Sequence, residues 1–113
     1  TMLSRNDREL VMRVGDHLRA ALPELPELDE TAAALKLTPR TLNRRLEAEG
    51  SSFRAIKDAL RRDIALTRIA KSTQPVATLA ADLGYADPSA FYRAFVGWTG
   101  MSPSAYRRRL QDS

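Results

Sequence analysis

The chain of 113 residues, 43% hydrophobic and 28% charged, is long enough for one folded, soluble domain and too short for two of ordinary size. Because it has no cysteine and no apolar run near the roughly 18 residues of a membrane span, disulfides, thiolate metal sites and membrane partners are excluded, and we expect a cytoplasmic protein. The net charge of +4 divides into −3 over residues 1–35 and +7 over residues 36–113, so the later part favours a polyanionic partner.

Helical periodicity recurs along the chain and alternating strand patterns do not, so an all-α fold is expected. The first helix is predicted from about Ser4 to Leu22, ending at Pro23, with one apolar stripe formed by Leu10, Val14, Leu18 and Ala21. An acidic linker with two prolines follows. Asp29 or a neighbour is expected to cap a second, alanine-rich helix that runs through Leu35.

Three later helices share one start signal, a capping side chain followed by proline at the first helical position: Thr38-Pro39, Asp87-Pro88 and Ser102-Pro103. Gly50 is expected to end the first of these helices.

A long helix is predicted from about Ser52 to Lys71, and its buried face is expected to hold Phe53, Ala55, Ile56, Leu60, Ile64, Leu66, Thr67 and Ile69. Its charges have the spacing of salt bridges within one helix: Arg54, Asp58, Arg61 and Arg62. The segment STQPV breaks this helix, and a short helix from about Val76 to Leu83 follows.

The two halves of the chain repeat one small unit. An offset of 49 residues aligns Thr38 with Asp87, Leu42 with Phe91, Arg44 with Arg93 and Leu46 with Phe95, and an offset of 48 aligns Leu35 with Leu83 and Leu37 with Tyr85. Each unit is an alanine-rich helix, a turn and a proline-started helix with one apolar face. This pattern predicts two helix-turn-helix units, at about 29–50 and 76–98.

Helical geometry directs the arginines of the first unit away from its core. If Leu42 and Leu46 define the core direction, Arg44 and Arg40 lie about 180° and about 140° from it, with Thr41 and Asn43 on the flanks. In the second unit the buried stripe is expected to be Phe91, Ala94, Phe95 and Trp98. The outward positions then correspond in pairs: Arg40 with Ser89, Asn43 with Tyr92, and Arg44 with Arg93.

Arginine and asparagine exposed at the start of a helix suit the major groove of double-stranded DNA. Arg can bind O6 and N7 of guanine and Asn can bind adenine, each pairing giving about 1–3 kcal/mol of discrimination. A lone exposed arginine is usually only solvated, but the repeat on a basic chain favours base contacts for Arg44 and Arg93. The residues expected at the DNA backbone are Thr38, Thr41, Arg45, Arg107 and Arg108; for Arg107-Arg108-Arg109, phosphate contact and a solvated helix both stay open.

Two stretches resemble the AraC/XylS family of bacterial transcription regulators. FYRAFVGWTGMSPSAYR, from Phe91 to Arg107 and preceded by LAADLGY, is similar to the family's C-terminal signature, and LNRRLEAEGSSF, from Leu42 to Phe53, is similar to its first helix-turn-helix. The resemblance spans about Leu10 to Arg109. It implies about seven helices that form two helix-turn-helix subdomains, joined by the long helix at about 52–71, with recognition helices in successive major grooves.

The family's base-reading positions fall on six residues of this chain: Arg40, Asn43, Arg44, Ser89, Tyr92 and Arg93. Two departures stand out, since Leu46 replaces a common aromatic and Val96-Gly97 replaces a common basic residue. Because Ser89 and Tyr92 offer less to a base edge than their counterparts, the first unit is expected to supply most of the base specificity.

The resemblance also implies partners. Family members carry a separate sensing or dimerisation domain upstream, so we expect residues 1–113 to be one domain of a longer regulator that self-associates through that missing part. RNA polymerase is an expected partner and no cofactor is expected. Whether the regulator activates or represses transcription stays open.

The sequence bears on two other classes of function. An enzyme is not expected, because the chain has one histidine and no cysteine, and GWTG lacks the spacing and the lysine of a phosphate-binding loop. The alternative is a helical protein-interaction module that contacts RNA polymerase or a regulatory partner, since DNA would repel the acidic first third. Salt dependence separates the two, because log affinity for DNA falls by about 0.9 per phosphate neutralised for each unit of log salt concentration.

Overall fold

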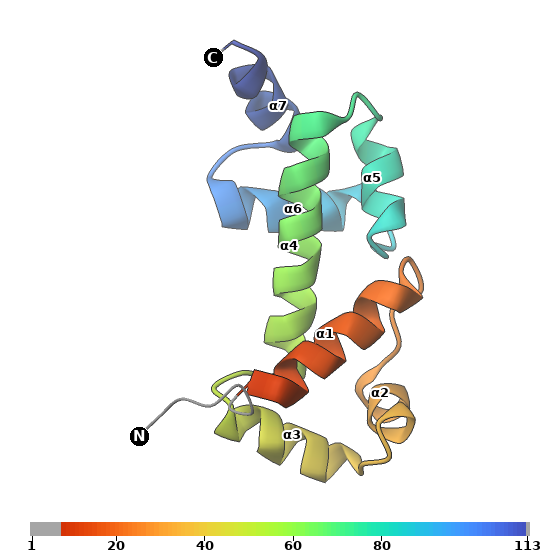
Figure 1. Ribbon diagram of the computed structural model, residues 1–113. Helices are drawn as coiled ribbons and strands as arrows, with labels where there is room; N and C mark the ends of the chain where they lie inside the picture. The colour runs from red at the N-terminus through yellow and green to blue at the C-terminus, as the bar shows by residue number, and fades with distance from the viewer. Residues whose placement is uncertain (1–7, 113) are drawn as a thin grey trace. The chain divides into compact units, whose positions relative to one another are not determined.

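The computed structural model describes residues 8–112, in which all regular structure is helical (Figure 1). The helices in chain order are α1 (Glu9–Ala21), α2 (Leu28–Ala34), α3 (Pro39–Ala48), α4 (Phe53–Lys71), α5 (Val76–Asp82), α6 (Pro88–Thr99) and α7 (Pro103–Gln111). The predicted all-α fold and the number of helices are confirmed for this part of the chain. The start predicted for the first helix, residues 4–7, lies outside it. None of the described helices combines the length and apolar character needed to cross a bilayer.

The three predicted cap-proline starts are confirmed. The side chains of Thr38, Asp87 and Ser102 each accept a hydrogen bond from the backbone N–H three residues later, at 3.1, 3.0 and 3.1 Å. Proline occupies the first position of α3, α6 and α7, where its missing N–H costs nothing. These starts are therefore fixed by local chemistry.

The cap of α2 is a neighbour of Asp29, an alternative that the sequence left open. Glu27, not Asp29, is the N-cap residue, and its backbone N–H donates to Glu30 Oε1 at 3.0 Å, so that the two glutamates form a reciprocal capping box. Asp29 lies in the first turn of α2, where its charge complements the positive end of the helix.

The buried face of α4 is narrower than predicted. Ile56, Leu60, Ala65 and Ile69 are buried, Phe53, Ile64 and Leu66 are partly buried, and Ala55 and Thr67 are exposed. Of the predicted salt bridges within this helix, Arg54 with Asp58 forms, at 3.9 Å. Arg62 instead pairs with its neighbour Asp63, and Arg61 donates to the backbone of the second repeat.

The described chain divides into two compact units within α4, the first ending at Leu60 and the second beginning at Arg61. Each unit contains one of the predicted repeats, α2–α3 in the first and α5–α6 in the second. Each repeat therefore has a core of its own.

The first unit has an aliphatic core, formed by Leu10, Val14, Leu18, Ala32, Leu42, Leu46, Ile56 and Leu60. Glu49, directly after α3, ties the end of this helix to the start of α1. Its carboxylate accepts hydrogen bonds from the backbone N–H groups of Leu10 and Val11, at 3.2 and 2.9 Å. A negative charge is favourable there because the first N–H groups of a helix have no partner within it.

The second unit has an aromatic core. Phe91 and Phe95 of α6 are fully buried, with Tyr85, Trp98 and Tyr106 packed around them. Ring centroids lie 5.4 Å apart for Tyr85 with Phe91 and for Phe95 with Tyr106, in tilted or edge-on arrangements. The predicted core role of Leu42, Leu46, Phe91 and Phe95 agrees with their burial, while Trp98 is only partly buried.

Candidate nucleic-acid interface

The turn between the two helices has the same backbone geometry in both repeats. The N–H of Leu37 donates to the carbonyl of Ala32 at 2.8 Å, and the N–H of Tyr85 donates to that of Ala80 at 3.1 Å. The residue before each has a positive φ, +62° at Lys36 and +87° at Gly84. Such a left-handed residue ends a helix sharply and redirects the chain, so both repeats are genuine helix-turn-helix units.

In the first unit, α3 is held by the buried side chains of Leu42 and Leu46. Arg40, Asn43 and Arg44 lie exposed on the same helix, as the predicted geometry required. One α-helix with its apolar face buried and its donors exposed has the form that fits a major groove.

In the second unit, α6 is held by Phe91 and Phe95, and the exposed side chains are again the predicted ones: Ser89, Tyr92 and Arg93. Tyr92 is 51% exposed although it is a large aromatic residue. Together with Pro88, these three residues line a surface hollow of about 320 Å³ beside the start of α6.

The residues predicted to contact the DNA backbone from α3 lie at or near its surface. Arg45 and Thr38 are exposed and Thr41 is partly buried. Thr38 Oγ1 donates to Thr41 Oγ1 at 3.0 Å while it accepts the capping bond from the Thr41 N–H. The hydroxyl hydrogen of Thr41 is not used in either bond, so it can donate to a phosphate oxygen.

Arg107 is a correction to the predicted backbone contacts. Its guanidinium points inward, with Nε donating to the carbonyl of Ile69 at 3.4 Å and Nη1 to that of Gln74 at 2.8 Å. Nη2 is buried as well. Arg107 thus joins α7 to the end of α4 and cannot reach a phosphate in this conformation, whereas Arg108 is exposed.

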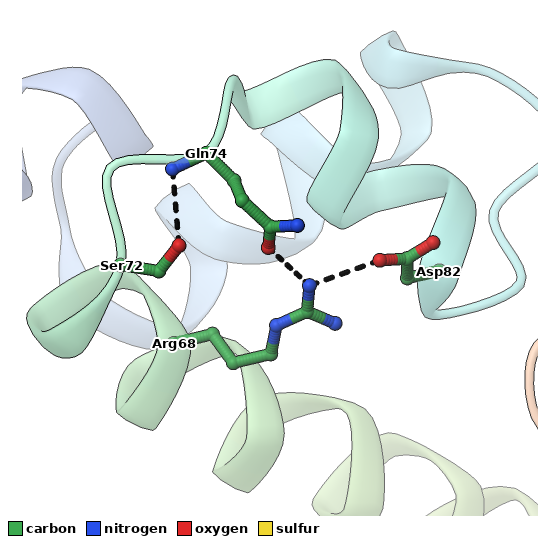
Figure 2. A network of polar contacts seen from close by, with 4 residues as sticks. All are labelled: Arg68, Ser72, Gln74 and Asp82. Atoms are coloured by element: carbon green, nitrogen blue, oxygen red, sulfur yellow. Dashed lines mark hydrogen bonds and ion pairs between the residues drawn. The ribbon is translucent and has the colours of Figure 1, made fainter.

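A polar network fixes α5, the first helix of the second repeat, and sequence reasoning did not identify it. Arg68 on α4 lies between the side chains of Gln74 and Asp82 (Figure 2). Its Nη2 atom donates to Asp82 Oδ2 at 2.9 Å and also to Gln74 Oε1, while the N–H of Gln74 donates to Ser72 Oγ at 3.0 Å. The partners come together only through the packing of α5 on α4.

Residues 31–109 match the family described as a helix-turn-helix domain. The chain belongs to the AraC-type helix-turn-helix family. The resemblance seen in the sequence is thereby confirmed.

Known relatives of the chain are regulators. It is 35% identical to the ornithine utilization regulator of Pseudomonas aeruginosa over 106 residues, which cover 94% of this chain and 29% of that protein. The chain thus spans under a third of the length of this relative.

Solved structures agree with the fold. The transcriptional regulator CdpR of P. aeruginosa superimposes with a TM-score of 0.80 at 34% identity, over 88% of this chain and 31% of that one. The DNA-binding domain of the global transcriptional factor AdpA, solved in complex with a target DNA, gives a TM-score of 0.76 at 26% identity, over 96% of each chain.

Proposed function

We propose that this chain binds specific sequences of double-stranded DNA and thereby regulates bacterial transcription. The observation that carries the proposal is the repeated placement of Arg44 and Arg93. Each is exposed at the same position of a proline-started helix whose other face is locked into a core. The DNA complex of the AdpA domain, which has the same fold, supports this proposal.

In the proposed complex, α3 and α6 each place their first turns in the major groove. Arg40, Asn43 and Arg44 contact bases from α3, and Ser89, Tyr92 and Arg93 do so from α6. Thr38, Thr41, Arg45 and Arg108 contact phosphates. Because α3 offers two guanidinium groups and an amide while α6 offers one guanidinium, the first unit supplies most of the base discrimination.

The proposal extends to the whole regulator. The chain acts in the cytoplasm as one DNA-binding domain of a longer protein, with an upstream part that senses a signal or self-associates, and it activates transcription through contact with RNA polymerase. The match to the ornithine utilization regulator, which covers 29% of that protein, supports the proposal of a longer regulator. A reporter gene placed behind the selected DNA site would show increased expression.

A protein contact is the second candidate function, and a surface groove in the first unit favours it. The groove measures about 240 Å³ and is lined mainly by apolar or small residues of α1 and α4, including Val11, Met12, Gly15, Ala55 and Ala59. Met12 is 65% exposed at its edge. Exposed apolar surface of this kind suits a protein partner, and it is compatible with DNA binding through α3 and α6.

Selection from a random double-stranded DNA pool by the purified chain tests the proposal. We expect an enriched motif with two short blocks about 10 base pairs apart between centres. Affinity for that motif should fall steeply with salt, by about 0.9 in log affinity per phosphate contact for each unit of log salt concentration. No enrichment at low salt would contradict sequence-specific binding and would move the protein contact to first place.

A further inference from the structure

One side chain of α4 binds three consecutive residues of the turn that precedes α6. Arg61 donates from Nε to the carbonyl of Leu83 at 3.0 Å and from Nη2 to that of Gly84 at 3.1 Å. The carbon at the centre of the same guanidinium lies 4.2 Å from the centroid of the Tyr85 ring. Lysine could not reproduce this arrangement, because only the planar fork of arginine offers two donors in fixed geometry and a flat face.

These contacts supply hydrogen-bond donors to backbone carbonyls at the end of α5. The last carbonyls of a helix lack N–H partners within it, and a positive charge there is favourable. Tyr85, held by the cation–π contact, packs in turn on Phe91, with ring centroids 5.4 Å apart. Phe91 is fully buried on α6, next in sequence to Tyr92. Two contacts therefore link Arg61 to the helix that carries the proposed base-reading side chains.

Among residues 8–60, the described part of the first unit, this link has no equivalent. Lys36 and Leu37 stand at the positions of Gly84 and Tyr85, so the turn lacks the aromatic ring. Within residues 8–112, no side chain donates to the carbonyls of Leu35 or Lys36. In the part of the chain that the structure describes, a side chain with the contacts of Arg61 is found in the second unit and not in the first.

We propose that Arg61 is a positioning residue that sets the orientation of α6 and so the base preference of the second unit, without touching DNA itself. This inference rests on the proposed function, since it concerns how that unit reads DNA. Arg61, Leu83, Gly84 and Tyr85 together form what we call the latch. Arg68, about two helical turns further along α4, reinforces the latch by its hydrogen bond to Asp82 of α5 (Figure 2).

The test compares Arg61→Ala with Arg62→Ala. Arg62 is the matched control, because it lies next to Arg61 on α4, carries the same charge and is exposed, and its guanidinium pairs with its neighbour Asp63 at 3.2 Å. Two further variants each remove only part of the contacts that Arg61 makes. Arg61→Lys keeps the charge and loses the fork, and Tyr85→Leu copies the residue of the first unit.

In DNA selection, Arg61→Ala should weaken the base preference in one of the two blocks of the motif and leave the other block intact. The weakened block should be the same one whose base preference is lost in Arg93→Ala. Affinity for the wild-type motif should fall about tenfold, as for the loss of one charge-assisted hydrogen bond. The dependence of log affinity on log salt should stay unchanged, whereas a lost phosphate contact would lower its slope by about 0.9. Arg61→Lys and Tyr85→Leu should be intermediate, and Arg62→Ala should keep both blocks.

Amide hydrogen exchange of the free protein tests the latch without DNA. Arg61→Ala should accelerate exchange at the N–H groups of Gly84 and Tyr85, which bond to Ala81 and Ala80, while the amides of α3 keep wild-type rates. Unchanged rates at Gly84 and Tyr85, or a second block kept in selection, would overturn the latch. Equal loss of both blocks, with faster exchange throughout, would show a structural role only and would also overturn it. Accelerated exchange in a protein that selects no DNA would uphold the latch and refute the proposed function.

Discussion

The two helix-turn-helix units share one local design and differ in how it is anchored. Both use a capping side chain, a proline and a left-handed residue in the turn. The first unit then relies on an aliphatic core and on Glu49, which joins α3 to α1. The second relies on an aromatic core and on arginines from α4 and α7 that bind backbone carbonyls or Asp82. The same local signals can thus be supported by quite different tertiary contacts.

This difference matches a difference in the exposed faces. The unit with the simpler anchoring carries Arg40, Asn43 and Arg44, whereas the unit with more anchoring contacts carries Ser89, Tyr92 and Arg93. In the proposed complex α6 makes fewer base contacts than α3, so we expect its orientation on DNA to depend more on its protein contacts. The second unit therefore should be more sensitive to changes away from the DNA.

The largest expected effect comes from truncating the cores. Phe95→Ala should destabilise the second unit by about 3–5 kcal/mol, because this side chain packs on Phe91, Trp98 and Tyr106. Leu46→Ala should cost the first unit about 2–5 kcal/mol. Amide exchange resolved by helix would locate each loss. Equal acceleration in both units from either variant would show that their cores are not separate.

A smaller effect is expected at the anchor of the first unit. Glu49→Ala removes two hydrogen bonds to the start of α1 and should destabilise that unit by about 1.5–3 kcal/mol. Glu47→Ala is the control, since Glu47 is exposed on α3, two residues before Glu49. Amides of Leu10 and Val11 should exchange faster only in the first variant. Indistinguishable rates in the two variants would contradict the anchoring role of Glu49.

The smallest expected effect concerns the left-handed turn residue. Lys36→Gly should stabilise the first unit by about 0.5–1 kcal/mol, because the strain of a side chain at φ +62° exceeds the entropy that glycine gains on unfolding. Gly84→Ala should destabilise the second unit by a similar amount. The midpoint of thermal unfolding should rise in Lys36→Gly and fall in Gly84→Ala. A change of the midpoint in the same direction in both variants would contradict the equivalence of the two turns.

Sequence reasoning succeeded where the determinant is local. The cap-proline pairs, the repeat, and the burial of Leu42 and Phe91 follow from spacing over a few residues, and so does the exposure of Arg44. The cap of α2 stayed open between Asp29 and its neighbours, because Glu27 and Asp29 both offer a carboxylate in an acidic run. Such a run does not specify which carboxylate caps.

The remaining contacts could not be predicted because they join distant residues. Arg61 was assigned to a salt bridge within α4 from its spacing, but its partners lie 22 and 23 residues away. For Arg107 the sequence leaves phosphate contact and a solvated helix open, but its guanidinium donates to the carbonyl of Gln74, 33 residues away. An arginine on a helix surface gives the same local signal in all of these roles, and only tertiary packing decides between them.

The most direct test of the account is DNA selection by the Arg44→Ala and Arg93→Ala variants in parallel with the wild-type chain. We predict that the wild type enriches two blocks about one helical turn apart, and that each variant relaxes a different one. Arg44→Ala should cause the larger loss of affinity, since in the proposed complex α3 makes more base contacts than α6. If both variants kept the wild-type motif, or both relaxed the same block, the claim that the two recognition helices read separate parts of one site would be wrong.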